Sequence, residues 1–411
     1  KVITILMDIK CYQKSLFRVW KQIMNKEFRL NLYLSYSHAL SDIMHIVFGL
    51  TLYFVSDDLN LSILSMGLLY NTASIFRGVS GFISGILSDR SNFIYWIILF
   101  AILSSIGSWM ISYSSDLNSF SIGVIVLGIG SGIYHPVGTS GITKYTTNTA
   151  KSLGYHSLGG AIGIALAPWF FINISSNYSW EASYLIFGLL TLPIILIYFD
   201  KEIVNLKKDF NIPHEKNVLN IDYKKVSPIF IYASFKDFSI SGLFLMLAVF
   251  INTLLKDSAS MFNDIDFYTS LISSVIILFG GIGAFAGGYL DNLKTRKNIL
   301  LISCLAAGLL FVLTSDNLLF AIIIFSVVSF LISSNDPSLG NWLGDTMPKN
   351  LHGTSFAFMY GLGQIIGSFS GSLAGVLLNY FSTTVYFRTL SIPLILASIV
   401  IFYWYKSISS K

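Results

Sequence analysis

Long apolar stretches separated by short polar segments run through most of this chain of 411 residues. A helix needs about 20 consecutive apolar residues to cross the hydrocarbon core of a bilayer. Twelve stretches approach that length, six on each side of a charged segment in the middle of the chain. They cover residues 30–55, 62–87, 93–113, 119–140, 152–175, 181–199, 228–255, 267–290, 297–314, 317–343, 353–379 and 385–405. The pattern predicts an all-α membrane protein with twelve transmembrane helices.

The second half of the chain repeats landmarks of the first half at an offset of 201 to 204 positions. The repeated pairs are Gly85 and Gly287, Asp89 and Asp291, His135 and Asp336, Pro136 and Pro337, Gly159 and Gly363, and Gly163 and Gly367. A nearly constant offset indicates a duplicated half. Duplicated membrane halves are typical of secondary transporters, whose substrate site lies between the halves.

Charge and the repeat together divide the chain into five parts. We expect an N-terminal segment at 1–29, a six-helix bundle at 30–200, a middle loop at 201–227, a second six-helix bundle at 228–405 and a tail at 406–411. Residues 1–29 lack the apolar core and the small-residue cleavage site of a signal peptide. We therefore expect this segment to stay on the same side of the membrane as the middle loop.

Charged residues are too few for a soluble protein of this size. They make up 11% of the chain, against about 25% in soluble domains. With twelve spans both termini lie on one side, whose segments hold 22 lysines and arginines, whereas the opposite loops hold only Lys256. Positive loops face the cytoplasm. We therefore expect a multi-pass protein of the plasma membrane with both termini in the cytoplasm. The net charge of +5 then reflects topology and does not indicate nucleic-acid binding.

Several ionisable side chains fall inside the expected spans. A charge at the centre of a span costs about 2.5–3.5 kcal/mol, so a charge that is kept there usually lines a cavity or is paired. The residues concerned are His38, Asp42, His45, Arg77, His135, Lys236, Asp237 and Asp336. They are the candidates for proton coupling, substrate binding or charge pairing.

His38, Asp42 and His45 are spaced i, i+4, i+7 and therefore share one face of the first span. A carboxylate in a low dielectric and a neighbouring imidazole can share a proton near physiological pH. The spacing predicts a proton-coupling site on this span. A purely structural hydrogen-bond cluster is the alternative interpretation.

Arg77 lies eight residues before Gly85, roughly 12 Å from the end of its span. At that depth we expect it to pair with Asp42 or to meet an anionic substrate. Lys236 and Asp237 are adjacent and point about 100° apart, so they do not form an ideal pair.

Two prolines and four glycines are expected to shape the helices. Pro136 and Pro337 free backbone carbonyls and bend their spans at equivalent positions, which suggests paired gating elements; tolerated kinks are the alternative. The glycines, which provide smooth faces for packing or sliding, are Gly159, Gly163, Gly363 and Gly367.

The six-plus-six arrangement with its charged middle loop resembles the major facilitator superfamily from about residue 30 to 405. The loop after the second span keeps Gly85, Leu87, Asp89 and Arg90 of the family signature, and the second copy keeps Gly287 and Asp291. The resemblance implies that spans 1, 4, 7 and 10 line a central cavity. It also implies that Asp89 latches the second span to the start of the eleventh in the outward-open state, and that the protein works as a monomer.

A finer resemblance is to the fosmidomycin-resistance-like drug exporters. It rests on the His38-x-x-x-Asp42 pair and on the glycine-rich stretch that ends in His135-Pro136. The chain departs from that subgroup at Val137-Gly138, where the subgroup usually has an acidic residue.

These features predict a proton-coupled secondary transporter of a small molecule, not an enzyme, with export of drugs or amphipathic compounds favoured. Import or uncoupled transport of an organic anion, sugar or other metabolite is an alternative. A receptor without transport activity or a metal-dependent membrane enzyme is another. No nucleotide-binding loop is evident, Cys11 and Cys304 indicate neither disulfide nor metal site, and we expect no cofactor and no metal.

Overall fold

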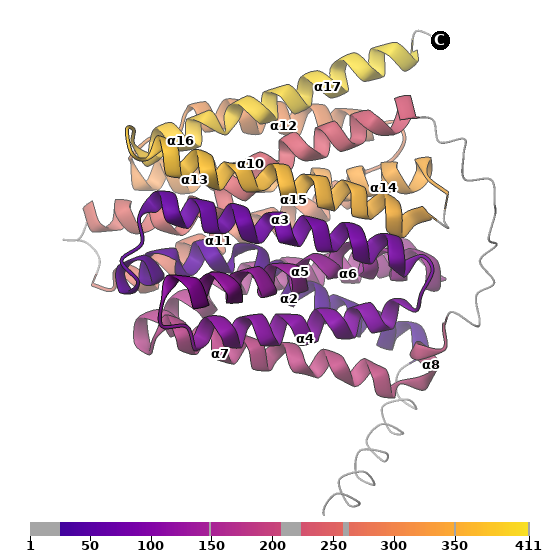
Figure 1. Ribbon diagram of the computed structural model, residues 1–411. Coiled ribbons are helices and arrows are strands. Elements are labelled where there is room, and N and C mark those ends of the chain that lie inside the picture. Colours follow the sequence, from indigo (N-terminus) through magenta and orange to yellow (C-terminus); the bar gives the residue numbers. More distant parts are fainter. Residues whose placement is uncertain (1–24, 148, 207–222, 258–262, 349–350, 410–411) are drawn as a thin grey trace, which may run out of the picture.

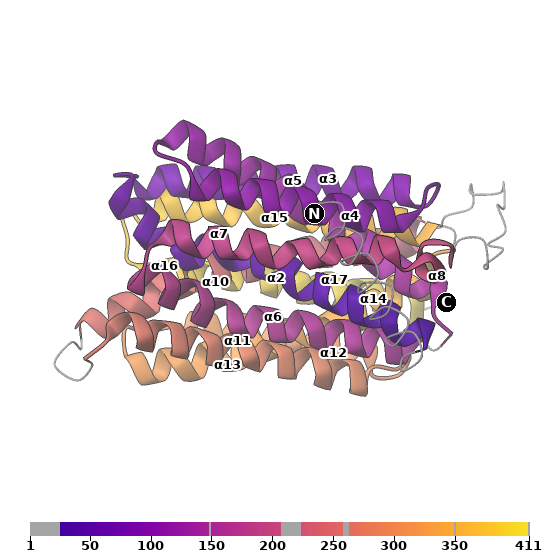
Figure 2. The same ribbon diagram turned by 90° about the horizontal axis from the view of Figure 1, so that it is seen from below.

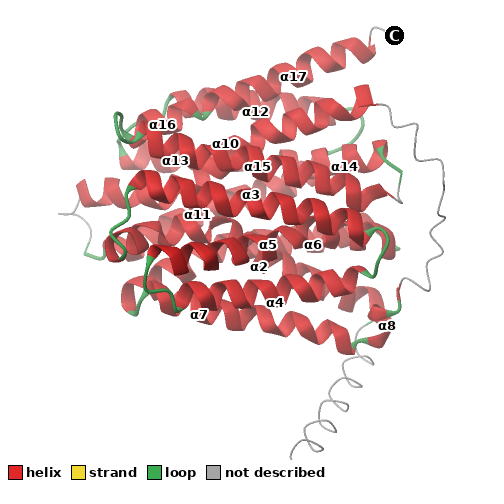
Figure 3. Ribbon diagram, in the orientation of Figure 1, coloured by secondary structure: helices red, strands yellow, loops and turns green. Residues whose placement is uncertain are grey.

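The computed structural model of the chain describes residues 25–147, 149–206, 223–257, 263–348 and 351–409 (Figure 1). Regular secondary structure in this part of the chain is helical throughout (Figure 3). Most of the expected N-terminal segment and of the middle loop lies outside the described residues, and so does the side chain of His45. The expected all-α fold class is confirmed.

The twelve expected spans appear as two groups of six, with boundaries a few residues from those expected. The first group comprises α2 (Lys26–Asp58), α3 (Ile63–Ser88), α4 (Phe93–Ser112), α5 (Leu117–Tyr145), α6 (Thr149–Asn177) and α7 (Trp180–Thr191) with its 3-10 continuation η1 (Leu192–Phe199). A short helix, α8 (Lys201–Val204), follows. Eight helical segments of the described chain are long and apolar enough to cross a membrane.

The second group begins after the middle loop. It comprises α10 (Tyr223–Asp257), α11 (Ile265–Leu290), α12 (Arg296–Val312), α13 (Leu318–Ser333) with α14 (Asn335–Thr346), α15 (His352–Leu377), and α16 (Thr383–Thr389) with α17 (Ser391–Ser409). The two bundles lie side by side, with α4 and α7 of the first at the bottom of Figure 1 and α12 and α17 of the second at the top.

Most of these helices begin at a polar residue that precedes the apolar run. The side chain at this position accepts a hydrogen bond from a backbone N–H of the first turn, which would otherwise lack a partner. The residues that do so are Asn25, Ser62, Asn92, Asp116, Ser179, Asp264, Asn317 and Ser382. Short polar loops therefore fix where each apolar stretch becomes a helix.

Prolines interrupt some of the helices. Pro337 cannot donate to the carbonyl four residues earlier, and the helix breaks at Ser334, between α13 and α14. Pro393 stands in the same relation to the break at Leu390, between α16 and α17. Pro136, in contrast, lies inside the unbroken helix α5. The two prolines at equivalent positions of the repeat therefore differ, since only Pro337 divides its helix.

The molecule has two chemically different ends. We call the end that carries α8 and the loops after α3, α5, α11 and α14 the basic end; it is on the right in Figure 1. The opposite end, with the loops after α2, α4, α10 and α12, is the acidic end. The acidic side chains at its helix starts include Asp116, Asp264 and Asp316.

The most extensive contacts between the bundles lie along two pairs of helices. α3 packs against α15 over its whole length, since Gly67 lies against Gly371 near the acidic end and Gly85 against Gly353 near the basic end. α6 and α11 lie side by side (Figure 2). Near the acidic end Asn173 donates to Ser270 at 2.8 Å and Ser176 to Asp266 at 2.8 Å. The acidic end is thus closed on both sides of the interface.

Candidate functional site

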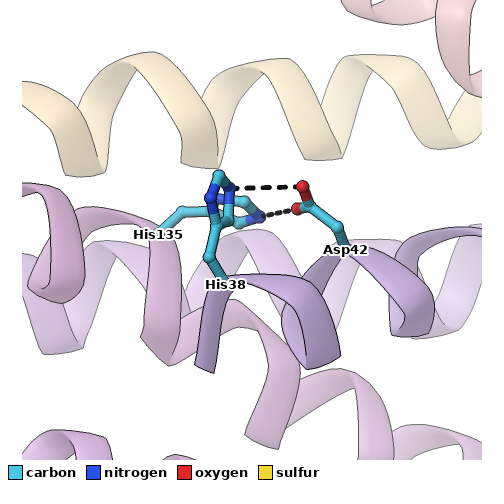
Figure 4. Close-up of side chains that lie close together, drawn as sticks. All are labelled: His38, Asp42 and His135. Carbon is cyan, nitrogen blue, oxygen red and sulfur yellow. Dashed lines mark ion pairs between the residues drawn. The ribbon is translucent and has the colours of Figure 1, made fainter. Parts of the chain in front are cut away.

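Asp42 in α2 lies between two imidazoles that come from different helices (Figure 4). Its Oδ2 is 3.2 Å from Nε2 of His38, one turn away on α2, and its Oδ1 is 3.1 Å from Nε2 of His135 on α5. The carboxylate side chain is 14% exposed. The helical spacing accounts for the first contact, and the packing of α5 on α2 adds the second.

Two residues that the sequence patterns did not single out as a proton site complete this cluster. His156 of α6 stacks on His38, with ring centroids 3.8 Å apart and an angle of 13° between the planes. Its backbone carbonyl accepts a hydrogen bond from Nδ1 of His38 at 2.7 Å. The hydroxyl of Tyr134 donates to the Leu34 carbonyl and lies 3.1 Å from Nε2 of His156. The cluster therefore ties α2, α5 and α6 together.

The second bundle holds a separate charge cluster. Nζ of Lys236 is 3.1 Å from Oδ1 of Asp237 and also donates to Oδ1 of Asp336 on α14. The adjacent residues, whose directions are not ideal for pairing, still make contact because the long lysine side chain can bend back toward its neighbour. Asp237 is 15% exposed and Asp336 is 54% exposed. The cluster therefore has one enclosed and one accessible carboxylate.

Arg77 does not form the expected ion pair with Asp42. Within the described part of the chain, the ion pairs of Asp42 are those with His38 and His135. The Arg77 side chain lies in α3 at 5% exposure, beside a small cavity inside the first bundle that Tyr70 and Ser131 also line. Arg77 still interacts electrostatically with Asp42 and with Asp237. It therefore lies between the charge clusters of the two bundles.

Asp89 lies at the interface of the bundles at the basic end. Its carboxylate accepts the backbone N–H of Gly353 at 3.2 Å and that of Thr354 at 2.9 Å, both at the start of α15. Lys144 at the end of α5 donates to the same carboxylate. Arg90 follows with an exposed side chain. Asp89 thus has the position that the resemblance implied for a latch.

The repeated aspartate makes contacts within its own bundle. Asp291 accepts hydrogen bonds from Arg296 at 2.8 Å and from Asn341 at 3.1 Å. Burial raises the pKa of Asp291, but the hydrogen bonds from Arg296 and Asn341 outweigh this effect, so the pKa lies below its ordinary value. Gly287 packs against the Ser334 carbonyl, beside the break in the tenth span. The two copies of the loop therefore differ in the surfaces that they join.

The glycines singled out in the repeat all lie at close helix contacts. Gly159 and Gly163 face the backbone of α2 at Ser35 and Ala39. Gly363 and Gly367 face Asp237 of α10, the first its side chain and the second its backbone. These positions pack the fifth span on the first and the eleventh on the seventh, which fits the repeat.

The cluster in the first bundle also has the composition of a metal site. The facing atoms of His38, Asp42 and His135 all lie within 4.8 Å of one another, and two imidazoles with a carboxylate are a common donor set for zinc. The sequence patterns indicated no third donor, because His135 is 93 positions away from Asp42 and joins it only through helix packing. The same atoms are already linked by contacts of hydrogen-bond length.

The sequence matches a family over nearly all of this architecture. Residues 34–371 and 261–410 match the profile described as Major Facilitator Superfamily. The chain belongs to the Major Facilitator Superfamily. It is therefore a multi-pass membrane protein of a family of transporters, which are not enzymes.

Individual relatives cover the chain to different extents. A Hexuronate transporter of Bacillus subtilis is 22% identical over 80% of this chain and 83% of its own length. The Protein TsgA homolog of Buchnera aphidicola is 31% identical, but the match spans only 39% of this chain and 42% of that protein. A solved superfamily structure, a bacterial homolog of the human lysosomal transporter Spinster in an inward-facing and occupied conformation, shares the fold. Its TM-score is 0.67 at 17% identity, over 93% of this chain and 98% of that one.

Proposed function

We propose that the protein is a proton-coupled secondary transporter that works by alternating access. In this proposal, His38, Asp42 and His135 exchange the proton, and the substrate binds between the bundles near Lys236 and Asp336. The observation that carries the proposal is the carboxylate of Asp42, held in a membrane helix between two imidazoles at 3.2 and 3.1 Å. The imidazole is the side chain that proteins most often use to exchange a proton near physiological pH.

The placement of the charged groups supports a site between the bundles. Asp42, His135, Lys236 and Asp336 stand on the first, fourth, seventh and tenth spans. Tyr360 of α15 joins the bundles at this point, since its ring lies 5.3 Å from that of His135 on α5. Two charge clusters, one from each bundle, therefore face a common region.

Part of this region is exposed. Asp336 is half exposed, although contacts join the bundles at the acidic end and Asp89 joins α3 to α15 at the basic end. One and two turns beyond Asp336, a Cβ at Gly340 or Gly344 would meet no described atom within 4 Å. Positive loops face the cytoplasm, so we infer cytoplasmic termini and a plasma-membrane location.

Charge balance favours a cationic substrate and export. The described groups near the site carry two fixed positive charges, Arg77 and Lys236, and three carboxylates, Asp42, Asp237 and Asp336. Without an additional proton this set has an excess negative charge, which either a proton or an organic cation can neutralise. Exchange of one for the other is the basis of proton-driven export of amphipathic cations.

A second candidate is transport of an organic anion. It is supported by the resemblance to a Hexuronate transporter over most of the chain and by the buried guanidinium of Arg77. In this case the substrate would contact Arg77, and the proton would travel in the same direction as the anion.

One experiment separates these candidates. Purified protein in liposomes with an internal pH dye receives an imposed proton gradient and, in turn, tetraphenylphosphonium, tetraphenylborate and glucuronate, with Asp42→Asn as the matched variant. Proton flux evoked by tetraphenylphosphonium in the native protein only would support cation exchange. Flux evoked by glucuronate would support the anion candidate. Substrate flux that persists in Asp42→Asn and without a gradient would overturn proton coupling, and a response to zinc alone would assign the cluster to a metal ion.

A further inference from the structure

We infer that the contact between His38 and Asp42 holds a single exchangeable proton, and that the backbone carbonyl of residue 156, made accessible by Gly160, fixes this arrangement. The inference rests on the proposed function, because it assigns the proton stoichiometry and the positioning residues of that same site.

Nδ1 of His38 carries a hydrogen. This atom lies 2.7 Å from the backbone carbonyl of His156. A carbonyl oxygen only accepts hydrogen bonds, so Nδ1 must carry a hydrogen. In a neutral imidazole the other nitrogen then has no hydrogen and can only accept.

Nε2 of the same ring faces a carboxylate oxygen. It lies 3.2 Å from Oδ2 of Asp42. If His38 were neutral and Asp42 ionised, two acceptors would face each other at this distance in a site of low dielectric, which is unfavourable. The contact is satisfied only when one additional proton is present, either on Nε2 or on the carboxyl group. The charge of the pair is then zero.

The neighbouring imidazoles do not compete for this proton. Tyr134 uses its only hydrogen toward the Leu34 carbonyl, so its oxygen accepts from Nε2–H of His156. His156 is stacked on His38 at 3.8 Å, and two imidazolium rings at this distance would repel each other. His135 satisfies the other oxygen of Asp42 as a neutral donor.

Gly160 is what allows His38 to reach the carbonyl of a helix. The carbonyl of residue 156 points along α6 toward residue 160, one turn further on. A Cβ at Gly160 would lie 2.5 Å from Oδ2 of Asp42 and 2.8 Å from Nδ1 of His38. These are side-chain atoms, so a methyl group here displaces the ring and the carboxylate without requiring a backbone shift. Gly163, in contrast, faces the backbone of Ala39.

Loss of the proton therefore has a structural consequence. A deprotonated pair must give up one of two contacts, because a neutral His38 can donate either to the carbonyl of residue 156 or to Asp42. The titratable and charged groups that face the His38–Asp42 pair are Tyr134 and His135 on α5, His156 on α6 and Arg77 on α3. We assign Gly160 and His156 as positioning residues, since they act through His38.

The test is nitrogen-15 NMR of histidine-labelled protein in lipid bilayers over a range of pH, with His38→Gln to assign the resonance. We expect Nδ1 of His38 to keep its hydrogen through the titration in the native protein, with one proton released per chain. In Gly160→Ala the ring is free to donate to Asp42 instead. We therefore expect the Nε2–H form at high pH and a release midpoint lower by about one pH unit, as the loss of one charged hydrogen bond implies.

The NMR results test the position and number of the protons independently of any transport measurement. An Nε2–H form of His38 in the native protein, or release of two protons, would overturn it even if Gly160→Ala failed to fold. Tyr134→Phe is the matched variant, because it loosens His156 and leaves the His38 ring unobstructed. If the NMR result is as expected and no substrate evokes proton flux, then the proposed coupling fails while the assignment of the proton stands.

Discussion

Thr354 donates two hydrogen bonds to one oxygen of Asp89, from its backbone N–H at 2.9 Å and from its hydroxyl at 2.8 Å, although the two residues belong to different bundles. Helix α15 has Leu351 before its first turn, and this residue offers no side chain to cap the helix. The carboxylate of Asp89 supplies the cap instead. A negative charge at a helix start is stabilised by the free N–H groups and the helix dipole.

Asp89→Asn is expected to loosen the basic end of the interface. The change removes a charge from the start of α15 and from Lys144, which costs about 1–2 kcal/mol. Spin labels at the exposed positions Tyr95 and Asn298, one in each bundle, measure the distance across this end. We expect a larger population of long distances in Asp89→Asn.

Asp291→Asn is the matched control for this measurement. Asp291 occupies the repeated position but contacts Arg296 and Asn341 of its own bundle. Its replacement should leave the distance between the labels as in the native protein. Equal effects of the two substitutions would contradict a specific role of Asp89 in joining the bundles.

A buried ion pair between the first helix and the end of the sixth is expected to be essential for stability. Nε of Arg29 is 2.7 Å from Asp200, and the side chains are 2% and 0% exposed. Removing one partner of such a pair leaves a buried charge and costs about 3–5 kcal/mol. Arg29→Met should therefore lower the free energy of unfolding by this amount, measured by denaturant titration in mixed micelles.

Glu202→Gln provides the comparison. Glu202 contacts the same guanidinium at 2.6 Å but is 51% exposed, so its charge is solvated and contributes less than about 1 kcal/mol. Equal free energies of unfolding for Arg29→Met and Glu202→Gln would contradict the expectation that burial determines the contribution of the Arg29 pair to stability.

The fold could be predicted largely from the sequence, because the membrane constrains the composition of each span. Each span must present a long apolar run, and that requirement is visible in the sequence. The effect of a proline was less predictable, because Pro136 is accommodated in an unbroken helix whereas Pro337 divides one. The bend depends on which neighbouring groups can satisfy the freed carbonyl.

The candidate site was predictable only where its geometry is local. His38 and Asp42 are one helical turn apart, so their contact follows from their spacing. His135 joins them through the packing of α5, which the single sequence does not specify. The acceptor for His38 is a backbone carbonyl, and no residue type at position 156 could have indicated it.

The contacts of Asp291 predict a dependence of stability on pH. The folded protein lowers the pKa of this residue, so its stabilising contribution is present above the ordinary value of about 4. It is lost as the pH falls through the lower folded value. Melting temperatures in detergent between pH 6 and pH 3 should fall more for the native protein than for Asp291→Asn. Parallel curves would mean that the hydrogen bonds of Asp291 do not affect stability.

The two carboxylates that share Lys236 should respond differently to substitution. Asp237 is 15% exposed and lies against Gly363, whereas Asp336 is 54% exposed. Loss of the enclosed charge leaves Lys236 without its buried partner. We therefore expect Asp237→Asn to destabilise the protein by about 3 kcal/mol and Asp336→Asn by less than about 1 kcal/mol.

Lys236→Met extends this comparison to both carboxylates. On its own it leaves two negative charges beside each other in the membrane, so we expect the largest loss of stability of the series, about 3–5 kcal/mol. Combining it with Asp237→Asn should restore part of that loss, because the remaining carboxylate, Asp336, can reach water. Unfolding free energies of the single and double variants form a double-mutant cycle. A coupling energy near zero would show that Lys236 and Asp237 do not stabilise each other, and the cluster would then have to be assigned to substrate contacts alone.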